Sequence, residues 1–309
     1  MYDIIGDIHG YANTLEALFK KIGYIKKDGI YQHPERKAVF VGDFIDRGPA
    51  IRECLQIVKP MVDSGFALAV MGNHEYNAIC YHTPAMDGRD WLRERSEKNV
   101  KQHHLTLKSF IDYDTEWKDY LEWFKKLPVY LDFGRLRIVH AFWNNEIIDK
   151  ITDALKGNRL NDSFLFQSTV KNSKQYQWIE DLLKGYELQL PDNIKYTDKD
   201  GFVRSEIRVK WWKVSKQETL RSICVKDGHT LPDKSVPSEI IAGIPVYKAN
   251  EPPVFFGHYW NTGNPSILMN NVCCVDYSIA RGGQLVAYRW NGESLLDSAN
   301  FVTQDNVDS

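Results

Sequence analysis

Five separated segments of the chain contain residue types that bind divalent metal ions. They supply Asp7 and His9 in GDIHG, Asp43 in GDFIDRGP, Asn73 in GNHE, His140 in IVHAFW and His258 in FGHYW. Carboxylate oxygens, imidazole nitrogens and an amide carbonyl suit borderline metals such as manganese, iron and zinc. Asp7 and His9 could bend to one ion, which Asp43 could bridge to a second ion. Asn73, His140 and His258 would then complete the ligands of the second ion.

The elements that must position these residues alternate between strands and helices. Strands are predicted over Tyr2–Ile5, Ala38–Val41 and Ala67–Met71, with helices over Tyr11–Ile22 and Ile51–Met61. This alternation predicts an α/β protein with a covered, parallel sheet. A glycine-led motif follows each strand, so the metal-binding residues gather at the carboxyl edge of the sheet, where open α/β sheets bind ligands.

The remaining sequence divides into three further regions. Residues Asn99–Leu127 predict a helical run that Pro128 stops. Residues 145–250 are more polar and contain no glycine-ended strand, so we interpret them as an insertion or cap between core segments 1–144 and 251–309. The strand pattern returns at Val254–Gly257, Val272–Asp276 and Gln284–Trp290.

These motifs, in this order, resemble the metallophosphoesterase (calcineurin-like) superfamily. GDIHG, GDFIDRGP and GNHE are similar to its phosphoprotein phosphatase branch, which includes symmetrical diadenosine tetraphosphate hydrolases. The resemblance covers Met1–Trp143 and Val254–Gly292. It implies an α/β/β/α sandwich of two mixed sheets, with an inserted cap region partly covering metals at the strand ends.

The resemblance also implies a role for each motif residue. Asp7, His9 and Asp43 would hold the first metal, and Asp43, Asn73, His140 and His258 the second. His74 would protonate the leaving oxygen, Asp46 would orient His74, and Arg47 would clamp the phosphate. These roles agree with the chemistry, because two cations lower the pKa of a shared water and arginine matches two phosphate oxygens.

Two substrate classes remain open at this point. The enzyme is expected to hydrolyse phosphomonoesters, phosphoproteins included, by a hydroxide that bridges two divalent metal ions. The alternative is a symmetrical dinucleoside polyphosphate hydrolase, because the same centre can attack an anhydride phosphorus. Manganese is the favoured metal, with iron, zinc or nickel as alternatives.

Two departures from the family pattern concern the pocket. Trp260 occupies the position where the superfamily often has a second histidine, and the bulky Phe142 and Trp143 follow His140. We expect Phe142 and Trp143 to shape or narrow the pocket.

Arg208, or else Lys210, is the candidate for a second phosphate clamp drawn from the insertion. It lies in Phe202–Trp212, where charged and apolar residues alternate, so a half-buried strand with a solvated charged face is the alternative. Five histidines match no motif and receive no chemical role: His33, His82, His103, His104 and His229.

Charge and cysteine content limit the partners and the compartment. The 309 residues carry a formal net charge of -2, which gives no general attraction to nucleic acid. Stable nucleic-acid binding is therefore not expected. A membrane span is not expected either, because no uninterrupted apolar stretch is long enough to cross a bilayer. The expected substrate is a phosphorylated small molecule, nucleotide or phosphoprotein. The chain begins without a signal-peptide pattern. The five cysteines predict reduced, buried thiols in a cytoplasmic protein.

Overall fold

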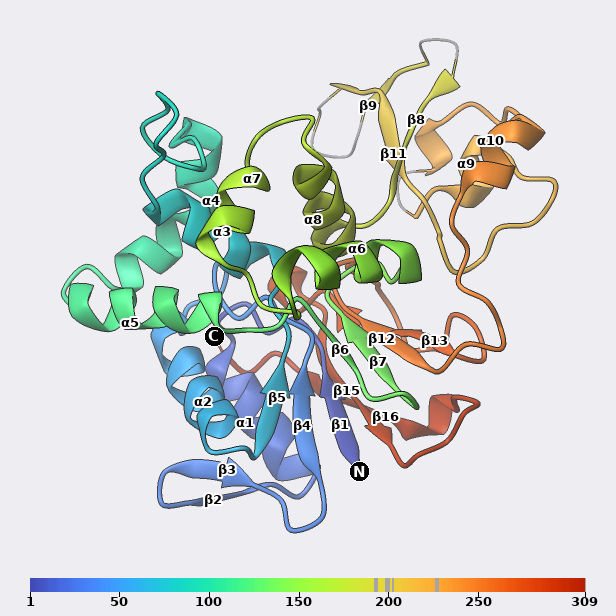
Figure 1. Cartoon of the computed structure of the whole chain (residues 1–309). Helices are drawn as coiled ribbons and strands as arrows, with labels where there is room; N and C mark the ends of the chain where they lie inside the picture. The colour runs from blue at the N-terminus through green and yellow to red at the C-terminus, as the bar shows by residue number, and fades with distance from the viewer. Residues whose placement is uncertain (192–193, 198–200, 202, 226–227, 309) are drawn as a thin grey trace.

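Two mixed β-sheets pack face to face in the computed structural model (Figure 1), which describes all residues except 192–193, 198–200, 202, 226–227 and 309. The larger sheet has the order β14 (Asp276–Tyr277), β15 (Gln284–Trp290), β1 (Tyr2–Ile5), β4 (Lys37–Phe40) and β5 (Ala67–Ala69), with β16 (Phe301–Asp305) also paired to β15. The smaller sheet has the order β13 (Val272–Cys274), β12 (Val254–Phe256), β7 (Arg137–Val139) and β6 (Tyr130–Asp132). Each sheet contains both parallel and antiparallel pairs.

The alternation of side chains along the strands builds the layers. Ile4 pairs with Val39 in parallel register, and both belong to an apolar cluster with Phe255 from the smaller sheet. The next pair, Ile5 and Phe40, points to the opposite face and packs in the cluster that contains the helices. The expected α/β/β/α sandwich of two mixed sheets is therefore confirmed.

Helices cover the outer face of each sheet. Figure 1 shows α1 (Ala12–Lys21) and α2 (Ile51–Asp63) beside the larger sheet. α3 (Asn73–His82), α4 (Glu97–Ser109) and α5 (Asp114–Lys125) follow along the chain. On the other side lie α6 (Asn145–Leu155), α7 (Asp162–Gln167) and α8 (Lys174–Lys184). Buried residues of α6 and α8 belong to the same large apolar cluster as Ile5, Phe40 and Phe256, which we call the main core.

The single helical run expected over residues 99–127 is two helices. α4 ends at Ser109 and α5 begins at Asp114. Phe110 in the break is buried, and its ring centroid lies 4.8 Å from that of Trp117. The chain therefore turns where an apolar side chain enters the core, although no proline or glycine marks the position.

The region expected to be an insertion has two structurally different halves. Its first half, α6 to α8, packs on the main core. Its second half contains the paired strands β8 (Glu187–Gln189) with β11 (Glu206–Arg208) and β9 (Tyr196–Thr197) with β10 (Val203–Arg204), followed by α9 (Leu220–Ile223) and α10 (Ser238–Gly243). This half has a small apolar core of its own and stands apart from the sheets in Figure 1.

Three smaller features complete the fold. A hairpin of β2 (Ile25–Lys27) and β3 (Ile30–Gln32) follows α1. All five cysteines are free and buried, and the adjacent Cys273 and Cys274 belong to apolar clusters on opposite faces of β13, as expected for neighbours in a strand. Within the described part of the chain, the helices are too short or too polar to cross a bilayer.

Candidate metal centre and active site

The carboxyl ends of the strands bring the expected metal ligands together. Asp7 follows β1 and Asp43 follows β4, while Asn73 is the first residue of α3, directly after the loop from β5. His140 and His258 follow the parallel strands β7 and β12 of the second sheet. Five of the six expected ligands are at most 8% exposed, and His258 is half-buried.

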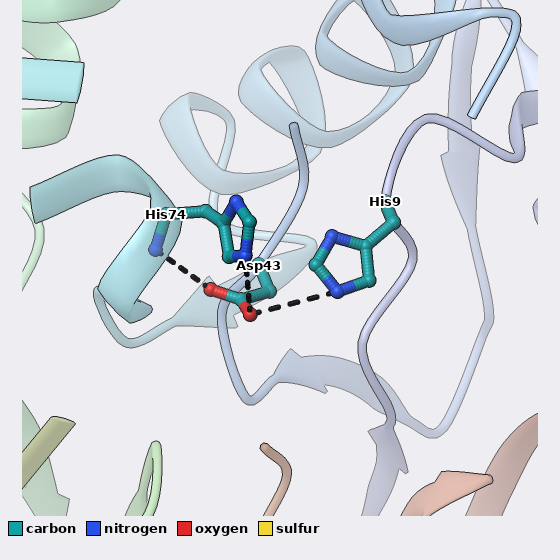
Figure 2. A group of neighbouring side chains, drawn as sticks. All are labelled: His9, Asp43 and His74. Carbon is teal, nitrogen blue, oxygen red and sulfur yellow. Dashed lines mark hydrogen bonds and ion pairs between the residues drawn. The ribbon is translucent and has the colours of Figure 1, made fainter. Parts of the chain in front are cut away.

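Asp43 lies at the centre of the group, between two sets of imidazoles. Its Oδ2 atom is 3.6 Å from Nε2 of His9, and its Oδ1 atom is 3.4 Å from Nε2 of His140. Figure 2 shows His9 and His74 on either side of this carboxylate. Two sets of ligand atoms lie within 4.8 Å of one another: His9, Asp43 and His74, and Asp43, His140 and His258. Because Asp43 belongs to both sets, its position suits a bridge between two ions.

Hydrogen bonds to backbone carbonyls leave two ring nitrogens available for metal. Nδ1 of His9 lies 2.9 Å from the carbonyl oxygen of Ile45, and Nδ1 of His140 lies 2.7 Å from that of Val41. In both rings the Nδ1–H donates to the carbonyl, which leaves an Nε2 lone pair directed at the cluster. The Oδ1 atom of Asn73 lies 3.0 Å from Nε2 of His140 and 2.8 Å from Nδ1 of His258.

Three buried polar atoms around the cluster have no hydrogen-bond partner among the described residues. They are Oδ1 of Asp7, Nε2 of His9 and Nε2 of His258. Leaving a buried polar atom unsatisfied costs about 1–3 kcal/mol, so such atoms are rare unless something else binds them. A carboxylate oxygen and two imidazole nitrogens are a donor set that fits borderline divalent cations.

Electrostatics at the cluster also fit bound cations. Burial, followed by the nearby charges of Asp276 and Asp43, raises the pKa of Asp7 well above its usual value. Burial would also raise the pKa of Asp43, but His140 and His74 outweigh it and hold that pKa well below the usual range. Burial and Arg47 lower the pKa of His9 to about 3. A positive ion between Asp7 and Asp43 would offset the repulsion between carboxylates that helps to raise the pKa of Asp7.

His74 and Asp46 form a close pair beside the cluster. Nδ1 of His74 lies 2.5 Å from Oδ2 of Asp46, and Nε2 of His74 lies 3.2 Å from a guanidinium nitrogen of Arg47. The other carboxylate oxygen of Asp46 accepts hydrogen bonds from Nδ1 of His103 at 2.9 Å and from Oγ1 of Thr106 at 2.5 Å. Burial would raise the pKa of Asp46, but hydrogen bonds from His103 and His74 lower it below its usual range. Asp46 is therefore held as an anion that can orient a proton-carrying imidazole.

Four residues near the site have no role in the sequence interpretation. Glu75, the last residue of GNHE, accepts backbone hydrogen bonds from Asp43, Phe44 and Gly72 at 2.8, 2.8 and 3.0 Å, so it ties the β4 loop to the start of α3. Asp276 is the first residue of β14 and raises the pKa of Asp7 through its charge. His103 and Thr106 contact Asp46, and their three-residue spacing on α4 was the available signal that they share a helix face.

Burial raises the pKa of Glu75 to about 7, together with the charge of Asp43. The carboxylate is fully buried and adjoins both Asp43 and His74. Its three backbone hydrogen bonds favour the ionised form and oppose this rise.

Arg47 contacts both His74 and Trp260. The Arg47 guanidinium lies 4.1 Å from the ring centroid of Trp260, and that of Arg281 lies 3.7 Å from the same ring. Burial lowers the pKa of Arg47, although Asp43 opposes this effect. Trp260 thus holds a cationic side chain at the position where the superfamily often has a histidine.

Phe142 and Trp143 pack into the core rather than lining the active-site cavity. Both are at most 2% exposed. The ring centroid of Phe142 lies 5.4 Å from that of Trp211, and that of Trp143 lies 5.7 Å from that of Tyr130. The expectation that they shape the pocket directly is therefore wrong, because the chain after His140 turns toward the helices.

Arg208 lies on the wall of the same cavity as Arg47 and His74. One guanidinium nitrogen is 2.9 Å from Oε1 of Glu187, and Nε is buried without a hydrogen-bond partner among the described residues. Burial and the charge of Arg208 lower the pKa of His258. The structure therefore brings Arg208 to the site, although Glu187 engages part of its guanidinium.

Several site residues have an unusual backbone conformation. Positive φ angles occur at His9 (47°), Asp43 (55°), Asp46 (66°), Arg47 (70°) and His258 (69°). Residues other than glycine seldom adopt this left-handed region, and it is maintained only where the surrounding structure enforces it. Here it lets side chains turn back toward one point from loops that leave separate strands.

A cavity of about 750 Å³ opens beside Asp46, Asn73 and His74. Its described lining contains three carboxylates, Asp46, Glu180 and Glu187, against a larger set of cations: Arg47, Arg93, Lys98, Lys171, Lys184, Arg204 and Arg208. Although the whole chain is slightly acidic, this surface is basic, so it favours an anionic substrate.

The comparisons with known proteins identify the class to which this fold and site belong. Residues 2–258 match the family model described as calcineurin-like phosphoesterase, and the chain belongs to this family.

Part of this chain is similar to curated proteins named bis(5'-nucleosyl)-tetraphosphatase PrpE [asymmetrical]. The protein from Halalkalibacterium halodurans is 47% identical over 145 residues, which cover 45% of this chain and 56% of the relative. The protein from Geobacillus thermodenitrificans is 34% identical over 158 residues, which cover 50% of this chain and 62% of the relative. The match thus spans roughly three fifths of each relative's length.

Among solved structures, a yeast protein serine/threonine phosphatase with similarity to human phosphatase PP5 has a similar fold. The TM-score is 0.52 at 13% identity, covering 100% of this chain and 80% of that one. At this identity the likeness concerns the fold alone.

Proposed function

We propose that the protein is a metal-dependent phosphohydrolase that cleaves a phosphoanhydride bond in dinucleoside polyphosphates. The observation that carries the proposal is the position of Asp43, whose carboxylate lies between His9 on one side and His140 on the other and is adjacent to the His74–Asp46 pair. The relatives named as tetraphosphatases support the anhydride substrate, and the basic lining of the adjoining cavity agrees with a multiply charged anion.

The proposed ligands are Asp7, His9 and Asp43 for one ion, and Asp43, Asn73, His140 and His258 for the other. When bound, two divalent ions would supply Lewis acidity and lower the pKa of water so that hydroxide is available near neutral pH. The unpartnered atoms of Asp7, His9 and His258 support this assignment. We propose manganese as the metal, because the mixed oxygen and nitrogen donors suit it, with iron, zinc and nickel as alternatives.

The side chains beside the cluster handle the leaving group and the phosphate. His74, held by Asp46 through Nδ1, is placed to donate a proton from Nε2 to the departing phosphate oxygen. In the structure an Arg47 N–H donates to Nε2 of His74, so this contact must open when Nε2 carries the proton. Arg47 can then offer its fork to phosphoryl oxygens, and Arg208 supplies a second cation across the cavity. The ionised Asp46 stabilises the protonated imidazole before transfer.

Phosphomonoesters, phosphoproteins included, are the second candidate substrates. The fold likeness to a serine/threonine phosphatase keeps this candidate open, because the same side chains could act on a phosphate ester. The five buried, free cysteines support placing either activity in the reducing cytoplasm.

Product analysis distinguishes the candidates. Manganese-loaded protein is incubated with diadenosine tetraphosphate and a phosphopeptide together, with Asp43→Asn as the control. We expect nucleotide products and an intact phosphopeptide. The relatives' names specify asymmetrical cleavage, which yields ATP and AMP, whereas the symmetrical cleavage considered from the sequence yields two ADP. Phosphate released from the peptide alone would overturn the proposal in favour of the phosphomonoesterase.

A further inference from the structure

We propose that Arg93 binds an anionic group of the substrate beyond the phosphate under attack, where the active-site cavity meets a second cavity. This inference rests on the proposed phosphohydrolase function and adds a residue that selects extended phosphate chains. Arg93 lies in the segment between α3 and α4, outside every motif that positions the metal ligands.

Two cavities share one wall at Arg93. The first, of about 750 Å³, contains Asn73 and His74, and the second, of about 930 Å³, extends toward Arg89, Trp91 and Arg95. Arg93 lines both cavities, as do Lys171 and Lys184. A substrate that fills the first cavity and continues into the second must therefore pass Arg93.

Neutral oxygens hold the guanidinium of Arg93 in a fixed orientation. It donates to Oδ1 of Asn77 at 2.9 Å, to Oδ1 of Asn99 at 2.8 Å and to Oε1 of Gln102 at 3.3 Å. The three acceptor residues lie on α3 and α4, so two helices fix the Arg93 side chain. A guanidinium held in place loses little conformational freedom when it binds an anion.

The positive charge of Arg93 is not neutralised at contact distance. The described carboxylates form no ion pair with its half-buried guanidinium, and the nearby Glu180 is bound to Lys184. Burial of a charge without an ionic partner is costly, and burial lowers the pKa of Arg93. An anionic ligand would provide the missing compensation.

Helix α3 sets the distance between Arg93 and the proposed metal site. Asn73 is a proposed metal ligand, and Asn77, which holds Arg93, follows four residues later on the same helix face. Four residues of α-helix rise about 6 Å, so Asn77 lies roughly one turn beyond Asn73. A small phosphomonoester at the metal ligands would end before Arg93, whereas a chain of two or more phosphates would reach it.

The second cavity has the chemistry of a nucleotide site. Trp91 and Tyr176 offer aromatic surface, and the guanidinium of Arg95 lies 3.5 Å from the ring centroid of Trp91. Lys171 and Arg93 add positive charge at the junction with the first cavity, where Lys184 is paired with Glu180. We therefore assign the junction to the phosphate chain and the second cavity to the distal nucleoside.

Binding of two small anions tests the role of Arg93. Manganese-loaded wild-type and Arg93→Gln proteins are titrated with orthophosphate and with methylenediphosphonate, a hydrolysis-resistant diphosphate, by calorimetry at fixed free manganese. We expect Arg93→Gln to raise the Kd for methylenediphosphonate by about tenfold or more, the loss expected for one charge-assisted hydrogen bond. The Kd for orthophosphate should change by less than about twofold, because one phosphate does not reach Arg93.

Three further variants separate binding from folding. Arg93→Lys keeps the charge and should restore most of the affinity for methylenediphosphonate. Arg135→Gln is the control, since Arg135 donates to the carbonyl of Gly292 and lines neither cavity. If Arg93→Gln does not fold, Asn99→Ala removes one anchor of the guanidinium and should raise the Kd for methylenediphosphonate alone.

Equal changes in Kd for the two anions, or no change for either, would overturn the inference. Arg93 would then only connect α3 to α4 through its hydrogen bonds. Turnover of diadenosine tetraphosphate by wild-type protein is measured separately. Absence of that turnover would refute the proposed substrate, while the anion comparison would still decide whether Arg93 binds an extended phosphate chain.

Discussion

At the residue scale, Asp46 connects the proposed proton donor to the rest of the protein. Its carboxylate receives hydrogen bonds from His74, His103 and Thr106, and its own backbone N–H donates to Oγ1 of Thr106 at 3.1 Å. His103 in turn forms a hydrogen bond with His82, and the two Nε2 atoms are 3.3 Å apart. The orientation of His74 therefore depends on a helix, α4, that contributes no proposed metal ligand.

Replacing His74 should reduce the rate mainly for substrates with poor leaving groups. We expect His74→Asn to lower kcat for phenyl phosphate by about 10²–10⁴-fold, the usual contribution of a general acid, and to affect p-nitrophenyl phosphate much less. His103→Gln should show the same pattern with a smaller loss, about tenfold, because Thr106 still holds Asp46. Steady-state kinetics with both esters and a metal assay check this. Equal losses on both esters would argue against proton donation by His74.

Asp181 gives a prediction about stability that is independent of the metal site. This carboxyl on α8 is 5% exposed, and burial raises its pKa to about 7, although Gln177 donates to it. In the unfolded chain the pKa is about 3.9, so the folded state binds the extra proton between about pH 4 and 7. The free energy of unfolding therefore falls as pH rises from about 4 to about 7. Above about pH 7 it stays at the lower value.

Asp181→Asn should abolish this pH-dependent decrease in the free energy of unfolding. We expect the variant to be more stable than wild type by about 1–3 kcal/mol at pH 8 and nearly equal to it at pH 4.5. Urea unfolding at both pH values measures the difference, with Asp149→Asn on an exposed face of α6 as the control. A variant less stable than wild type at pH 8 would show that the buried carboxylate is compensated by contacts beyond Gln177.

At the element scale, the loops after β4 and β5 approach so closely that only glycine fits between them. Gly42 has a φ of +101°, and a Cβ there would lie 2.5 Å from the backbone nitrogen of Gly72. A Cβ at Gly72 would lie 2.3 Å from the backbone nitrogen of Asp43. This contact brings Asp43, on one loop, next to Asn73 and His74 on the other.

A matched pair of glycine variants tests this packing. Gly42→Ala and Gly134→Ala both place a side chain at positive φ, but a Cβ at Gly134 meets no atom within 4 Å. Gly134→Ala should therefore cost only the backbone strain, about 1–2 kcal/mol. Gly42→Ala should cost about 3 kcal/mol or more and weaken manganese binding, because the two loops must separate. Denaturation and metal titration compare the pair, and equal costs would contradict the account.

Local sequence patterns predicted some helices, strands and site residues correctly and missed others. Strand Tyr2–Ile5 was predicted with its observed bounds, because apolar side chains ended at a glycine motif. The division of residues 99–127 into α4 and α5 was missed, since burial of Phe110 rather than a helix-breaking residue sets the break. His103 was missed for a related reason: its contact with Asp46 is tertiary and leaves no local pattern except its spacing from Thr106. The proposed metal ligands, by contrast, all lie in motifs at strand ends.

At the scale of the whole molecule, metal binding and folding should be coupled. The ligands come from both sheets and from loops as distant in sequence as Asp7 and His258, and the backbone N–H of His258 donates to Oδ2 of Asp7 at 2.9 Å. Only the folded chain brings these groups together, so an ion bound there stabilises the native state by mass action.

Manganese should therefore raise the thermal unfolding temperature, and a chelator should reverse the change. At 100 times Kd the stabilisation is about 2.7 kcal/mol, which corresponds to several degrees in Tm. Differential scanning calorimetry of wild type and Asp43→Asn measures the effect, and the variant should show a much smaller rise. A rise of equal size in the variant would place the stabilising ions elsewhere.

The number of metal ions that the Asp43 cluster binds shows whether Asp43 bridges two ions. Wild-type protein and Asp43→Asn are equilibrated with manganese, freed of loosely bound metal by gel filtration, and analysed by inductively coupled plasma mass spectrometry. We expect about two manganese ions per wild-type chain, because Asp43 lies between two groups of proposed ligands, and at most one per variant chain. One ion or fewer in the wild type, or an unchanged count in the variant, would contradict a two-metal centre bridged by Asp43.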